Sequence, residues 1–240
     1  MPSMDARADD APAELWLADW RRRIAELYAE VRRLAADDPP AAHAYWRAER
    51  ERLFRGHPQS PVPPAERSTF RARHFRYQPA FRFEVRLEGG GLPAPGSSSG
   101  PPAPGSSSGP PAPGSSGGPP IELPNSGREV LAFRRIGAVT LPFADRPRRL
   151  AVFWIEGYAG GLFLPFRDAT NGRQTYGAGR YLLDGAKGAD LGGDPARGAL
   201  VLDFNFGYQP SCAFDPRWAC PLAPPENGLD VAIRAGERLA

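Results

Sequence analysis

Hydrophobic residues in the first 56 positions recur with the spacing of amphipathic helices. Apolar side chains three and four residues apart form one stripe, while Arg and Glu fill many of the other positions. The stripe consists of Trp16, Trp20, Ile24, Leu27, Val31 and Leu34. Acidic residues and prolines at 37–40 end this helix, and a second helix is expected from about Pro40 to Phe54. We therefore predict a helical hairpin at residues 1–56 that packs on the rest of the chain, because two such helices bury little apolar surface alone.

From residue 57 the pattern changes to the two-residue period of β-strands. In FRFEVRLE, at residues 81–88, hydrophobic and charged residues alternate strictly, which gives the strand one apolar face and one solvent-exposed face. Short segments rich in β-branched and aromatic residues follow, separated by Gly, Pro and Asn. The clearest predicted hairpin is RDATNGRQTY, where Asn171 and Gly172 would occupy the two positive-φ positions of a type I′ turn. The pattern predicts a mostly β, α+β fold, an antiparallel β-barrel or sandwich with an N-terminal helical hairpin.

A low-complexity linker follows the alternating strand. Three near-identical nine-residue units, PAPGSSSGP, PAPGSSSGP and PAPGSSGGP, run from Pro93 to Pro119 without a charge or a core-forming side chain. This composition predicts a disordered Pro/Gly/Ser linker at residues 92–120. Because both flanks have the pattern of strands, we interpret it as an expanded hairpin loop within one β domain at residues 57–240. Loop closure costs only about 0.6 kcal/mol per doubling of length, so such an insertion is tolerable.

Composition and charge disfavour several classes of protein. Hydrophobic residues make up 41% of the 240 positions, enough for a core, yet the apolar runs are far shorter than the roughly 20 residues of a membrane span. The acidic N-terminus lacks the apolar region of a secretory signal, so we expect a cytoplasmic protein with reduced cysteines. The net charge of +3 is small, and only RSTFRARHFRY at residues 67–77 is both basic and aromatic. Nucleic-acid binding and membrane association are therefore not expected.

The segment ALVLDFNFGY at residues 199–208 places two polar residues on one strand face if the alternation continues. Asp203 is then a candidate general acid or base, and Asn205 its orienting partner. The alternative is that both side chains make local contacts that fix the following turn.

A second polar segment, TNGRQTYGAGRY at residues 170–181, combines hydrogen-bonding side chains with glycines two positions apart. Thr175, Tyr176 and Arg180 are candidates to bind a polar or anionic molecule, because glycines leave a strand face bare for a ligand or another backbone. A bulge or a bend of the sheet explains the glycines equally well. Arg180 would also pair with Asp203 if their strands were neighbours.

Cys212 and Cys220 lie in a proline-rich loop, and neither matches a known pattern for chemistry. Their spacing differs from the usual C-x2-4-C of structural zinc sites, and no histidine lies near them in sequence. We therefore assign no metal ligand, and no cofactor is indicated. A disulfide would contribute about 2–3 kcal/mol in an oxidising setting. The simpler interpretation is that both are small buried groups that hold the loop together.

Several long motifs resemble an uncharacterised bacterial and archaeal family, DUF1684. They are LFLPFRDATNGRQTYGAGRYLLD, then LDFNFGYQPSCAFDPRWACPLAPPENGLDVAIRAGE, and upstream WRAERERLFRGHPQSPVPPAERSTF and FRYQPAFRFEV. The resemblance covers most of residues 41–237, although the family has a much shorter connection in place of the linker. It implies one integrated domain and carries no activity or catalytic residue with it.

Three hypotheses for function remain open. The first is a small-molecule-binding β domain, enzymatic or not, whose pocket combines residues 170–181 with Asp203, Asn205, Tyr208 and Glu226. Its ligand would be polar or anionic, and Asp203 and Glu226 are the candidate catalytic residues. The alternative is a non-catalytic protein-interaction domain in which these polar side chains lock the loop. A third is a metal-assisted hydrolase that uses Asp203, Glu226 and a histidine.

Overall fold

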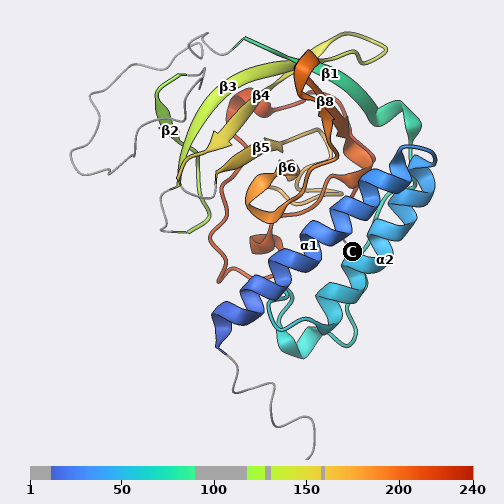
Figure 1. Ribbon diagram of the computed structural model, residues 1–240, viewed down its shortest axis with the longest axis vertical. Helices are drawn as coiled ribbons and strands as arrows, with labels where there is room; N and C mark the ends of the chain where they lie inside the picture. Colours follow the sequence, from blue (N-terminus) through green and yellow to red (C-terminus); the bar gives the residue numbers. More distant parts are fainter. Residues whose placement is uncertain (1–11, 90–117, 128–130, 158–159, 240) are drawn as a thin grey trace, which may run out of the picture.

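The computed structural model describes residues 12–89, 118–127, 131–157 and 160–239. Helix α1, Ala13–Ala35, and helix α2, Pro39–Gly56, form a hairpin along one side of a curled β-sheet (Figure 1). Ile24, Leu27 and Val31 of the apolar stripe of α1 are buried. The Asp38 carboxylate caps α2 by accepting a hydrogen bond from the Ala41 N–H at 3.0 Å. The predicted helical hairpin is confirmed.

Eight antiparallel strands form one sheet within the described ranges, in the order β6-β5-β4-β3-β1-β8-β7, with β2 also paired to β3. Their bounds are β1 Arg82–Glu88, β2 Pro120–Glu122, β3 Ala132–Leu141, β4 Arg148–Ile155, β5 Gly161–Phe166, β6 Arg180–Asp184, β7 Gly193–Asp194 and β8 Ala199–Asp203. The sheet curls into a half-barrel (Figure 1), which confirms the predicted α+β class with its antiparallel strands.

The two strands that flank the linker belong to the same sheet but do not form a hairpin. β1 and β2 both pair antiparallel with β3, Leu87 opposite Val139 and Pro120 opposite Arg134. The expectation of an expanded hairpin loop is therefore wrong, because the flanks follow each other along one strand instead of pairing together. The predicted linker at 92–120 lies outside the described residues except for 118–120, and Pro120 already begins β2.

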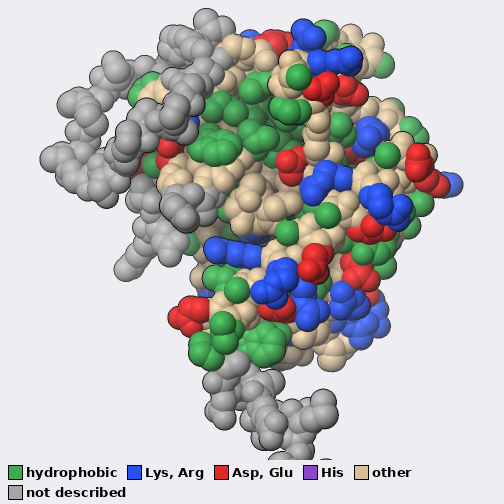
Figure 2. Space-filling model, in the orientation of Figure 1, with side chains coloured by type: hydrophobic (Ala, Val, Ile, Leu, Met, Phe, Trp, Pro, Cys, Tyr) green, Lys and Arg blue, Asp and Glu red, His purple; other side chains and the backbone are tan. Residues whose placement is uncertain are grey.

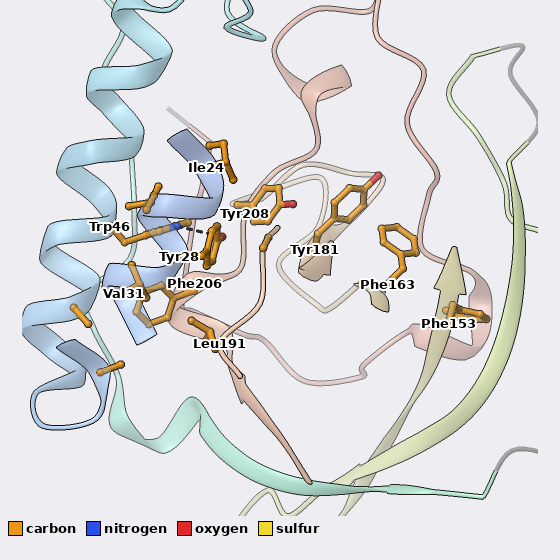
Figure 3. Close-up of a cluster of buried hydrophobic side chains, with 14 of the residues drawn as sticks. Ile24, Tyr28, Val31, Trp46, Phe153, Phe163, Tyr181, Leu191, Phe206 and Tyr208 are labelled. Atoms are coloured by element: carbon orange, nitrogen blue, oxygen red, sulfur yellow. Dashed lines mark hydrogen bonds between the residues drawn. The ribbon is translucent and has the colours of Figure 1, made fainter. Parts of the chain in front are cut away.

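Side chains from the two faces of the sheet enter two different hydrophobic clusters. Along β4, Leu150 and Val152 pack in one cluster, while Ala151 and Phe153 pack in the other. The second of these includes the helices, and Figure 3 shows its aromatic side chains reaching from Trp46 on α2 to Phe153 on the sheet. Both faces are therefore covered, which explains why the central strands are almost continuously hydrophobic.

The segment around Asn171 and Gly172 is not the predicted type I′ hairpin. Gly172 has a φ of +75°, but no non-glycine residue among the described ranges has a positive φ, so Asn171 does not adopt the required conformation. The Asp168 carboxylate instead accepts hydrogen bonds from Thr170 N and Oγ1 at 2.8 and 2.6 Å, and folds the segment into successive turns. Hydrogen bonds from side chain to backbone have replaced the expected strand pairing.

The helical face of the molecule carries charges of both signs. Figure 2 shows basic and acidic side chains intermingled over the two helices, in agreement with exposed ion pairs such as Arg33 with Glu30 and Arg52 with Glu49. Among the described residues, no helix has an apolar stretch long enough to cross a bilayer.

Candidate functional site

A cavity of about 210 Å³ lies between the helical hairpin and the loops that follow β6 and β8. Its apolar wall comes mainly from the helices and includes Leu17, Trp20, Ile24, Leu27 and Phe54. Figure 3 shows Ile24 and Tyr28 of α1 beside Tyr208 of the loop after β8, and all three side chains line the cavity. A dry engineered cavity of roughly 150 Å³ holds benzene, so this cavity has room for one ring with a small substituent.

The sequence of α1 explains why this wall faces the cavity. Leu17, Trp20, Ile24 and Leu27 are spaced by three and four residues and therefore share one face of the helix. Further along the same face, Val31 is fully buried in the core. Of the predicted apolar stripe, Trp20, Ile24 and Leu27 line the cavity, and Ile24 and Leu27 also pack with Val31 in the core.

A buried ion pair forms one side of the cavity. Arg50 donates to the Glu237 carboxylate from Nε and Nη2 at 2.6 and 3.1 Å, and its guanidinium lies 4.6 Å from the centre of the Tyr208 ring. The Gln209 N–H donates to the same carboxylate at 2.7 Å. Burial would raise the pKa of Glu237, but the charge and hydrogen bonds of Arg50 outweigh it and hold the pKa below its ordinary value. The ion pair joins α2 to the C-terminal segment and holds the Arg50 side chain in place at the cavity.

The ionisable groups that line the cavity make it suited to an anion. Arg21, Arg50 and Lys187 line it, and no Asp or Glu of the described ranges does. Arg50 is paired with Glu237, and the Lys187 ammonium lies 3.5 Å from Asp184. Arg21 forms no ion pair with a described residue. A carboxylate bound here would meet three basic side chains, of which Arg21 has no acidic partner among the described residues.

Two polar atoms at the cavity have no hydrogen-bond partner among the described residues. They are the acceptor Oε1 of Gln209 and the donor Nε1 of Trp218, both buried. An unsatisfied buried polar atom costs about 1–3 kcal/mol. Both atoms belong to residues that line the cavity, but the atoms themselves are buried.

Tyr208 is the one sequence-predicted site residue that lines this cavity. Its hydroxyl donates a hydrogen bond to Asp184 Oδ2 at 2.9 Å. Burial is the main cause that raises the pKa of Tyr208 well above its ordinary value, and nearby Asp184 adds to it. The phenol is therefore neutral near pH 7, where it acts as a donor and not as a base.

Asp203 and Asn205 lie in the core, away from the cavity lining. β8 ends at Asp203, and residues 204–206 form a short 3-10 helix that Asp203 caps through the Asn205 N–H at 2.9 Å. The Asn205 amide bonds to both backbone groups of Gln78, at 2.8 and 2.9 Å. The strand alternation predicted through Phe206 therefore stops three residues early. The Asp203 contact is the local turn contact named as the alternative, whereas the Asn205 amide joins a segment 127 residues away in sequence.

Arg180 and Thr175 are also fully buried, at 0% exposure each. Arg180 donates to Asp168 Oδ2 at 2.9 Å, and β6 does not neighbour β8, so the conditional pairing with Asp203 does not form. Thr175 bonds to Thr170 through the two hydroxyls at 2.8 Å. Both side chains hold the turns after β5 in place.

The remaining two predicted residues lie apart from each other. Glu226 is exposed and pairs with Arg135, with Oε2 and Nε 3.3 Å apart. The Tyr176 hydroxyl donates to Cys212 Sγ at 3.7 Å. The structure does not gather Arg180, Asp203 and Glu226 around one cavity, nor does it pair them with one another, and the ligand and catalytic roles assigned to them stay predictions.

No group of three or more His, Cys, Asp or Glu side chains in the described part of the chain is placed to hold a metal ion. Of the residues named for the metal-assisted hypothesis, Asp203 is bonded to Asn205 and Tyr77, and Glu226 to Arg135. These two acids do not share a site, so that hypothesis gains no support.

Most residues that line the cavity were not predicted from sequence. Arg50, Lys187, Gln209 and Trp218 come from four different segments, and no motif connects them. One available signal was Lys187, the only lysine in a chain whose other basic residues are arginines.

Comparison with known proteins identifies a family but no activity. Curated proteins give no match. Among solved structures, the NMR structure of an uncharacterized protein from Haloarcula marismortui is similar, with 27% sequence identity, a TM-score of 0.49, and coverage of 80% of this chain and 90% of that chain. The model of a family described as a protein of unknown function, DUF1684, matches residues 114–238, more than half of the 240 residues. The chain therefore belongs to the DUF1684 family.

Proposed function

We propose that the protein binds a small carboxylate with a single-ring or branched hydrocarbon body, in the cavity between α1 and the loops after β6 and β8. One observation carries the proposal. The cavity has an aromatic and aliphatic wall, three basic side chains and no acidic side chain among the described residues that line it. Sites for small molecules have this composition, an apolar surface with a few polar groups that fix orientation.

The polar groups suggest how such a ligand lies. Its carboxylate would face Lys187 and Arg21, because Arg50 already has both oxygens of Glu237 as partners. Its hydrocarbon body would pack between Trp20, Ile24 and Tyr208. The proposal is for binding, and no catalytic step is assigned.

Calorimetric titration of the full chain tests this proposal. Benzoate, phenylacetate and 4-hydroxybenzoate are compared with the neutral benzamide and benzyl alcohol at low and high salt. We expect the carboxylates to bind at least tenfold more tightly than the neutral molecules, and binding to weaken with salt. Equal affinity for benzoate and benzamide would contradict the proposal.

Variants of the basic residues add a matched control. Lys187→Ala and Arg21→Ala should each weaken benzoate binding about tenfold, which is about 1.4 kcal/mol. Arg22→Ala removes the neighbouring charge on α1, which does not line the cavity, and should leave the affinity unchanged. Ala186→Trp, at an exposed position of the cavity lining, should block it for every carboxylate. If Arg22→Ala weakens binding as much as Arg21→Ala, the carboxylate binds elsewhere.

A further inference from the structure

The two cysteines lie against each other in the loop after β8. The Cys212 N–H donates a hydrogen bond to Cys220 Sγ at 3.3 Å. This distance places the Cys220 sulfur beside the Cys212 side chain, because the nitrogen and Cβ of a residue share one Cα. Both are free thiols and both are buried. The pair therefore meets the first condition for a disulfide, which is proximity without a large movement of backbone.

The surroundings of the two thiols differ, so their acidities differ. The hydrogen bond with Cys220 is the main cause that lowers the pKa of Cys212 below its ordinary value, burial opposes this effect, and hydrogen bonds with Ser126 and Tyr176 add to it. The hydrogen bond to Cys212, reinforced by burial, raises the pKa of Cys220 above its ordinary value. Cys212 is therefore the more acidic of the two thiols, which suits it to act as the nucleophile with Cys220 as its resolving partner.

Access to the pair is narrow. Cys212 is 9% exposed and Cys220 4%, and Cys220 also borders the cavity. A bulky disulfide substrate does not reach sulfurs buried to this degree, whereas hydrogen peroxide is little larger than water. The geometry therefore favours a peroxide as the oxidant.

We infer that Cys212 and Cys220 form a redox-active dithiol that hydrogen peroxide converts to a reversible disulfide. The Cys212 thiolate attacks one peroxide oxygen, the O–O bond breaks, and the leaving hydroxide takes a proton from solvent to become water. Cys212 is then a sulfenic acid. The Cys220 sulfur attacks the Cys212 sulfur, the S–O bond breaks, and the hydroxide leaves as a second water with the proton of the Cys220 thiol. The two sulfurs lose two electrons in total, and the peroxide gains them. This inference does not depend on the proposed ligand.

Intact-mass measurement on the full chain tests the inference. The reduced protein is exposed to hydrogen peroxide at neutral pH, denatured in an alkylating agent and weighed. We expect a product that is lighter by two hydrogen atoms, takes up no alkyl group, and returns to two alkylated cysteines after dithiothreitol. If both cysteines remain alkylatable, or carry oxygen instead of a disulfide, the inference is wrong.

Single variants assign the roles of the two sulfurs. Cys220→Ser should stop at a product heavier by one oxygen atom, which a sulfenic-acid reagent captures, while Cys212→Ser should react at least tenfold more slowly. Tyr176→Phe removes one donor to Cys212 and should shift the pH dependence of the oxidation rate to higher pH. Equal rates for the two Ser variants would overturn the assignment of Cys212 as the nucleophile.

Discussion

Two buried arginines fasten the C-terminal segment to the rest of the fold. Arg50 binds Glu237 through two hydrogen bonds, and Arg180 donates to the backbone carbonyls of Ile233, Ala235 and Glu237. Neither guanidinium is exposed to more than a few per cent. Arginine suits this role because its planar guanidinium group has five N–H donors in fixed directions.

Removing Arg180 should be one of the most destabilising substitutions in the chain. Arg180→Met leaves the Asp168 carboxylate buried without its cation and three carbonyls without a donor, so we expect the free energy of unfolding to fall by about 3–5 kcal/mol. Arg33→Met breaks an exposed pair with Glu30 and should cost less than about 1 kcal/mol. Urea denaturation followed by circular dichroism measures both. Similar losses for the two variants would show that the Arg180 contacts do not contribute as described.

The structural role of Arg180 could not be predicted from its sequence position. The alternation of hydrophobic and polar residues shows that Arg180, Asp203 and Asn205 are polar residues in or next to strands. It does not show which backbone atoms they contact in the folded chain. Their partners, at Ile233 and Gln78, are 53 and 127 residues away. Local sequence is equally compatible with a bound ligand and with these contacts, so only the tertiary arrangement distinguishes the two.

The helices were predictable because their signals are local. The three- and four-residue spacing defined α1, and the acidic residues before α2 together with the prolines of its first turn defined its start. The turns around Asn171 were mispredicted because the Asp168 side chain competes with strand pairing for the same backbone groups. The sequence pattern also could not predict that β1 and β2 both pair with β3, because this depends on the register of β3.

The start of α2 gives a prediction for a single element. Asp38→Ala removes the side-chain acceptor for the Ala41 N–H, and we expect a loss of about 1 kcal/mol in the free energy of unfolding. Asp37→Ala is the matched control, because the neighbouring acid makes no capping contact. Thermal unfolding of both variants checks this expectation. A loss for Asp37→Ala equal to that for Asp38→Ala would assign the effect to charge and not to the cap.

At the scale of the whole molecule, two histidines lie where the helical hairpin meets the β domain. His43 of α2 packs against Phe206, with 5.5 Å between ring centres, and against His74 at 6.0 Å. His43 Nε2 and both ring nitrogens of His74 have no hydrogen-bond partner among the described residues. A protonated imidazole would place an unsolvated charge in this junction, so the packing of helices on sheet depends on both rings staying neutral.

Lowering the pH should therefore destabilise the contact between the helical hairpin and the β domain at a higher pH than the one at which most carboxylates become protonated. Burial is the main cause that lowers the pKa of His43 to about 3 and of His74 to about 4, with Glu237 opposing the shift at His74. The unfolded chain binds protons at these histidines near pH 6.5 while the folded chain does not, so stability is complete above that pH and is lost as the pH falls toward 4.

Urea denaturation at about pH 7 and about pH 5 measures this loss. Each histidine should cost about 2 kcal/mol at the lower pH, since one pKa unit corresponds to about 1.4 kcal/mol. His43→Gln does not titrate in this range, so its free energy of unfolding should change with pH by about half as much as that of the parent chain. A pH dependence that His43→Gln leaves intact would mean that the junction does not depend on a neutral His43.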